Sequence, residues 1–131
     1  MKACINSQRK KLPCEVEHIV ITEKNCESYV HFSEYIMKKV QDESITLTTF
    51  SDMLREKLLY EYGGIWFDAT VLIHKPFPID YFRLPLYTCK GKEYHFSSYS
   101  QWSLWCMGGV KKNNIFKFLF DLFCEYYKYN E

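Results

Sequence analysis

The most constraining feature of the sequence is a helical repeat that stops at two glycines and gives way at once to an apolar run. Apolar side chains recur every four residues through this helix, at Phe50, Leu54, Leu58 and Tyr62. The charged side chains fall on the other side of it, at Glu56, Lys57 and Glu61. Thr49 is expected to cap the N-terminus, with Asp52 three residues later, and Gly63-Gly64 supplies the left-handed backbone that ends a helix. The pattern predicts a helix over residues 50–62.

The apolar run over residues 65–73 predicts a buried strand, and it contains one carboxylate, Asp68. An ionised carboxylate inside such a run costs several kcal/mol unless it is paired, hydrogen-bonded or bound to a metal. The strand is therefore expected to end at Asp68 or to open there into a cleft. A purely structural, hydrogen-bonded Asp68 is the alternative.

The rest of the chain alternates helical and strand patterns without repeats. Strands are predicted over residues 15–21, 86–88, 94–96 and 103–107. Helices are predicted over residues 33–40 and from a cap at Asn113 or Asn114 to Tyr127, where five apolar side chains form a wide face: Phe116, Leu119, Phe120, Phe123 and Tyr127. This order predicts a mixed α/β fold in one domain spanning residues 1–131.

Composition excludes several classes of protein. With 47% hydrophobic residues and a formal net charge of +1, the 131-residue chain must bury a core, which argues against disorder and against binding nucleic acid by charge. The sequence contains no run of about 18 uncharged apolar residues, so it predicts no membrane span. The N-terminal segment has no apolar core of signal-peptide length, and the 6 Cys form no C-x-x-C pair, so a cytoplasmic location with buried thiols is expected.

The candidate binding residues lie before and after the two glycines. Asp52 and Arg55 are three apart on the predicted helix and therefore neighbours on one face. An Arg fork binds diphosphate oxygens, an Asp accepts from sugar hydroxyls, and a carboxylate at a strand end can hold a divalent cation against phosphates. These groups are what a nucleotide-sugar site requires. A helix-capping role for Asp52 and a simple ion pair for Arg55 are the alternatives.

The stretch TTFSDMLREKLLYEYGGIWFDATVLIHKPFP resembles the capsular polysaccharide synthesis family of bacterial glycosyltransferases. It is more distantly similar to glycosyltransferases with a DXD sugar-binding motif. The resemblance joins an S-D-x-x-R helix, a Y-G-G stop and an I-W-x-D-A-T-V strand in one order and spacing, and a weaker likeness covers most of the chain.

The resemblance implies an incomplete GT-A type, Rossmann-like domain that binds a nucleotide-sugar donor, with Mn²⁺ or Mg²⁺ as cofactor. It assigns the donor sugar and diphosphate to Asp52 and Arg55, and it makes Asp68 the first Asp of the DXD motif, a catalytic and metal-binding residue. Thr70 stands at the second Asp position, and a neutral hydroxyl is a poorer ligand for a hard dication. Gly63 and Gly64 form the structural turn that sets where Asp68 points. Family members have a strand before the first helix and continue beyond the last, so the chain is expected to be truncated at both ends.

The expected function is transfer of a sugar from a nucleotide donor to a glycan or lipid-linked saccharide acceptor, with peripheral contact at the inner membrane face as an option. Trp102 is a candidate for stacking on a sugar ring, and core packing is the alternative for Trp102 and Trp105. A non-catalytic remnant of the family is a second hypothesis. A phosphatase with Asp68 as nucleophile is a third, and the lack of a later acidic pair argues against it.

Overall fold

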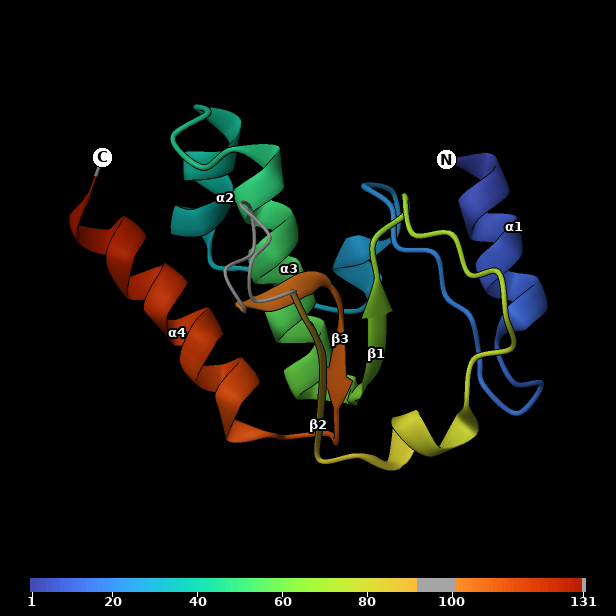
Figure 1. Ribbon diagram of the computed structural model, residues 1–131. Helices are drawn as coiled ribbons and strands as arrows, with labels where there is room; N and C mark the ends of the chain where they lie inside the picture. The colour runs from blue at the N-terminus through green and yellow to red at the C-terminus, as the bar shows by residue number, and fades with distance from the viewer. Residues whose placement is uncertain (92–100, 131) are drawn as a thin grey trace. The chain divides into compact units, whose positions relative to one another are not determined.

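The computed structural model describes residues 1–91 and 101–130, and the predicted strand over residues 94–96 lies outside them. The chain forms two compact units (Figure 1). One unit contains residues 1–20 and 64–110, and the other contains residues 21–63 and 111–131. The mixed α/β class is confirmed. A Rossmann-like sheet is absent from the described residues, whose strands form a small antiparallel sheet.

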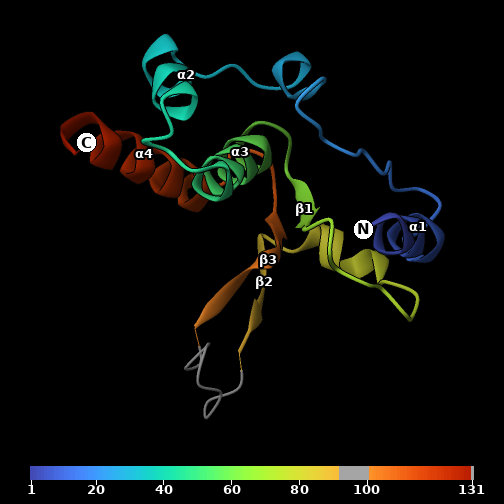
Figure 2. The same ribbon diagram turned by 90° about the horizontal axis from the view of Figure 1, so that it is seen from above.

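The first unit is built on that sheet, in the order β1-β3-β2. Its strands are β1 (Gly64–Phe67), β2 (Leu86–Lys90) and β3 (Trp102–Gly109), and Figure 2 shows β2 and β3 running side by side. The close spacing at the centre requires glycine, since a Cβ on Gly108 would lie 2.2 Å from the carbonyl oxygen of Gly64. The ranges of β2 and β3 confirm the predicted strands over 86–88 and 103–107.

An aromatic cluster packs within the first unit. Phe77 lies at its centre, with ring centroids 5.1 Å from Phe67 and 5.4 Å from Tyr81, and Phe82 and Tyr87 complete it. Helix α1 (Lys2–Lys11) joins this unit through the backbone, because the N–H of Phe77 donates to the carbonyl of Lys11 at 2.8 Å. A short 3₁₀ helix, η2 (Ile79–Arg83), leads into β2.

The second unit is helical, with η1 (Cys26–Ser28), α2 (Glu34–Gln41), α3 (Leu47–Tyr62) and α4 (Asn114–Tyr129). Its buried centre is Ile36, Ile45 and Met53. Partly buried side chains from three helices and their connections pack around that centre: Phe32, Val40, Phe50, Phe120, Phe123, Cys124 and Tyr127. The predicted helix over 33–40 is confirmed with Ser33 as its cap, and Asn113 caps α4 by accepting from the N–H of Ile115.

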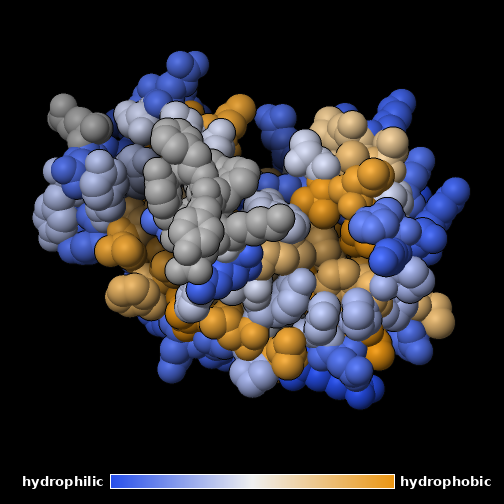
Figure 3. Space-filling model, viewed as in Figure 1, coloured by the Kyte–Doolittle hydropathy of each residue, from blue (hydrophilic) through white to orange (hydrophobic). Residues whose placement is uncertain are grey.

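Helix α4 is apolar on more than its packed side. Phe116 is fully buried, as predicted, whereas four large side chains on another side of the helix are exposed: Phe118, Leu122, Tyr126 and Tyr129. Figure 3 shows hydrophobic side chains at the surface where α4 runs in Figure 1.

Two predicted strands are corrected by the structure. Residues 15–21 form no strand, and Ile19 is 41% exposed. An alternating pattern makes a strand only where a partner strand completes the hydrogen-bond ladder, and β1 pairs with β3 instead. The strand predicted over 65–73 is shorter, because β1 ends at Phe67 and a turn follows Asp68.

Candidate functional site

Helix α3 begins earlier than predicted, and this changes the position of Asp52 relative to the start of the helix. Thr46 is the cap, since its side chain accepts from the N–H of Thr49 at 3.2 Å. The prediction that Thr49 caps the helix is therefore wrong. Asp52 lies in the second turn of α3, too far from the N-terminus to be explained as a cap or as a first-turn partner of the helix dipole.

Asp52 and Arg55 are brought together as the spacing predicts. Nη2 of Arg55 donates to Oδ1 of Asp52 at 2.8 Å. The Arg55 side chain is only 4% exposed, and that of Asp52 is 26% exposed. A buried ion pair of this kind is weak evidence for stability, because removing both charges from water costs about what their attraction returns. Stability alone therefore gives little reason for a guanidinium at this position.

Glu56 is a buried residue that the sequence pattern misplaces. The helical repeat assigns it to the charged outer side of α3, but it is 1% exposed. Burial, with a smaller contribution from the charge of Asp52, raises the pKa of Glu56 to about 7, although Arg55 opposes the shift. Residues 53–56 are all buried, so burial of α3 is not confined to the one face that the apolar repeat marks.

Gly63 and Gly64 end α3 in the manner predicted. Their φ angles are 72° and 90°, and the N–H of Gly63 donates to the carbonyl of Leu59 at 2.9 Å. Residues with a Cβ rarely adopt such φ angles, which explains why glycine stands at both positions. Four residues after Gly64, the chain reaches Asp68.

Asp68 lies at the end of β1, half-buried, which confirms that the strand stops at the carboxylate. Nε1 of Trp66 donates to Oδ1 of Asp68 at 2.7 Å, so the indole orients the carboxylate. The N–H of Asp68 donates to the carbonyl of Trp105 on β3 at 2.9 Å. The indole therefore provides a hydrogen bond for the half-buried carboxylate, and the backbone bond holds Asp68 beside β3.

Gln8 on α1 holds the loop after β1, and sequence reasoning missed it. Its side-chain amide donates to the carbonyls of Asp68 and Val71, at 3.0 and 2.9 Å, and the residue is 3% exposed. His18 lies 3.3 Å from the Gln8 amide oxygen, and burial, helped by the charge of Arg9, lowers the pKa of His18. No local pattern could reveal Gln8, because its partners lie 60 and 63 residues away in the chain.

Thr70 and the two tryptophans are open to solvent. Thr70 is exposed in the turn after Asp68. Trp102, at the start of β3, is 55% exposed, and Trp105 is 45% exposed. Core packing is therefore wrong for both tryptophans, and the stacking role of Trp102 stays a prediction.

The predicted divalent cation has few protein ligands. Within residues 1–91 and 101–130, no group of three or more His, Cys, Asp or Glu side chains could hold an ion. Asp68 supplies one carboxylate, and a cation bound there would take its other oxygen ligands from phosphates and water, as Mg²⁺ does in many nucleotide sites. The described residues alone do not form a cation cage.

Comparison with known proteins identifies the family. The model of the family described as capsular polysaccharide synthesis protein matches residues 1–131. The chain belongs to this family. No curated protein and no solved structure matches the chain significantly. No helix in the described part of this family member is long and apolar enough to cross a membrane.

Proposed function

We propose that this member of the capsular polysaccharide synthesis family is a glycosyltransferase that uses a nucleotide-sugar donor. The observation that carries the proposal is the ion pair on α3 between the buried Arg55 and the partly exposed Asp52. A buried ion pair is weak evidence for stability, and strongly shifted pKa values, such as that of the neighbouring Glu56, cluster at functional sites. The family match supplies the biological context, which is the synthesis of a surface polysaccharide.

Each residue has a role that follows from its chemistry. Arg55 neutralises the donor diphosphate through its planar fork, and Asp52 holds that fork and accepts from a sugar hydroxyl. Asp68, oriented by Trp66, accepts from hydroxyls of the donor sugar. In the transfer, the bond from the anomeric carbon to the diphosphate oxygen breaks and a bond to an acceptor hydroxyl oxygen forms. The hydroxyl proton is released, and the nucleoside diphosphate leaves with the bonding electrons.

The catalytic contribution of these residues is electrostatic and positional. Negative charge grows on the diphosphate as it leaves, and a fixed guanidinium stabilises that charge more in the transition state than in the bound donor. A carboxylate held by an indole keeps the sugar in one orientation without a cost of reorganisation at the moment of transfer.

Thermal unfolding with a panel of nucleotide sugars, each with and without Mn²⁺, tests the proposal. A donor at one hundred times its Kd stabilises the native state by about 2.7 kcal/mol. We expect one nucleotide class to raise the melting temperature of the wild type, and we expect Arg55→Met and Asp68→Asn to abolish the rise while still melting cooperatively. A cooperative wild type that no donor stabilises would contradict the proposal and favour a non-catalytic member of the family.

A further inference from the structure

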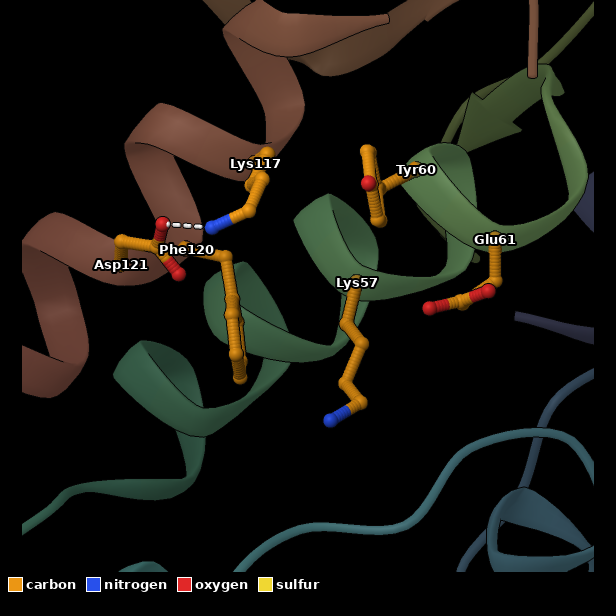
Figure 4. Close-up of a pocket in the computed structure, with 6 residues that line it drawn as sticks. All are labelled: Lys57, Tyr60, Glu61, Lys117, Phe120 and Asp121. Atoms are coloured by element: carbon orange, nitrogen blue, oxygen red, sulfur yellow. Dashed lines mark hydrogen bonds and ion pairs between the residues drawn. The ribbon is translucent and has the colours of Figure 1, made fainter. Parts of the chain in front are cut away.

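A recess between α3 and α4 lies within the second unit and uses none of the residues assigned to the donor. Its cavity volume is about 150 Å³. Figure 4 shows six lining side chains, three from each helix: Lys57, Tyr60, Glu61, Lys117, Phe120 and Asp121. Pockets for drug-sized ligands measure about 300–1,000 Å³, so this recess fits one small ring rather than a nucleotide sugar.

The recess combines aromatic surface with ion pairs at its rim. Lys117 pairs with Asp121 one turn further along α4, as the dashed line in Figure 4 shows. Lys112, just before α4, pairs with Glu61 and places its ammonium 4.3 Å from the centroid of the Tyr60 ring. The rim therefore offers both carboxylate acceptors and ammonium donors.

Lys57 differs from the other lysines of the recess in its neighbours. Its ammonium lies 4.8 Å from the centroid of Phe120 and 5.2 Å from that of Phe32. In the part of the chain that the structure describes, rings rather than a carboxylate lie at contact distance from it. A cation held over aromatic faces keeps its charge available for an anionic group of a ligand.

These features select one class of ligand. A purely anionic ligand would meet the carboxylates of Glu61 and Asp121, and a cationic one would meet the lysines. A sugar ring has an apolar C–H face for an aromatic surface and hydroxyls that both donate and accept. We propose that the recess binds an acidic sugar residue of the glycan acceptor, with its carboxylate on Lys57 and its hydroxyls on the rim. This inference rests on the proposed function and names the acceptor class.

The test is an NMR titration of the full chain with methyl glucuronide and, in parallel, with methyl glucoside. We expect glucuronide to shift amide signals of the facing parts of α3 and α4, and to bind at least about tenfold more tightly than glucoside, since a charge-assisted hydrogen bond is among the stronger polar contacts. Lys57→Met keeps the apolar stem and removes the ammonium, so it should remove this preference. Lys128→Met, the same change at a lysine of α4 that does not line the recess, should leave the preference in place.

Several results would overturn the inference. It is wrong if the two glycosides bind equally, if neither binds, or if Lys57→Met retains the preference. Should Lys57→Met fail to fold, Lys57→Gln provides the same test, because it also removes the ammonium and keeps part of the apolar stem. Donor-induced stabilisation separates the two proposals: it should be equal in wild type and Lys57→Met, and its absence alongside intact glucuronide binding would refute the donor role only.

Discussion

Replacing Glu56 with glutamine should change how the stability of the protein depends on pH. The pKa of Glu56 rises from 4.5 to about 7 on folding, chiefly through burial. Below pH 4.5 the carboxyl is protonated in both states. Between pH 4.5 and 7 the unfolded chain loses this proton while the folded chain keeps it, so folding stability falls as pH rises. One pKa unit corresponds to about 1.4 kcal/mol, which gives a total loss of about 3 kcal/mol for the wild type across this range.

Glu56→Gln keeps the shape of the side chain and cannot ionise, so the variant should lack this loss. Urea denaturation of both proteins at several pH values from 4.5 to 8 measures it. Relative to the wild type, Glu56→Gln should gain about 3 kcal/mol between pH 4.5 and pH 8. The comparison cancels titration of His18, which both proteins share.

A matched control lies on the same helix. The hydrogen bond from Lys112 lowers the pKa of Glu61, which is half-exposed. Its contribution is present above its unfolded pKa and lost as pH falls, the opposite sign to Glu56. Glu61→Gln should therefore leave the decline between pH 4.5 and 7 in place. Parallel stability profiles for wild type and Glu56→Gln would refute the argument that burial holds Glu56 protonated.

Three further substitutions test local features of the fold, each by chemical denaturation. Gly108→Ala places a Cβ against the carbonyl of Gly64 and should cost about 1–3 kcal/mol, so an unchanged midpoint would contradict the close approach of β1 and β3. Asn113→Ala removes the cap of α4 and should cost about 1 kcal/mol, which Asn113→Asp should largely restore. Trp66→Phe removes the hydrogen bond to Asp68 and should cost about 1–2 kcal/mol. In the Asp68→Asn background this cost should disappear only if the asparagine amide does not accept the indole hydrogen bond.

Local signals in the sequence predicted the elements that carry the proposed site. Gly63 had to end α3 because of its backbone freedom, and an ionised Asp68 could not continue a buried strand. The pairing of Asp52 with Arg55 followed from helix geometry alone. These predictions succeeded because each depends on residues within one or two turns of chain.

The predictions that failed depend on distant partners. Glu56 looked like an outer residue because the helical repeat reports one apolar stripe, whereas α3 is buried on more than that stripe. The alternating residues 15–21 have the composition of a strand but not the neighbour that would complete a ladder. Gln8 gave no signal, since the carbonyls that it binds become its neighbours only in the folded chain.

Arg55 is proposed to bind the diphosphate of a nucleotide-sugar donor. Calorimetric titration of the donor chosen from the melting panel into wild type, Arg55→Lys and Lys57→Met tests it most directly. Arg55→Lys keeps the charge but loses the planar fork, so the donor should bind at least about tenfold more weakly, while Lys57→Met, two residues further along α3, should bind it as the wild type does. Equal donor affinity in wild type and Arg55→Lys would contradict the account.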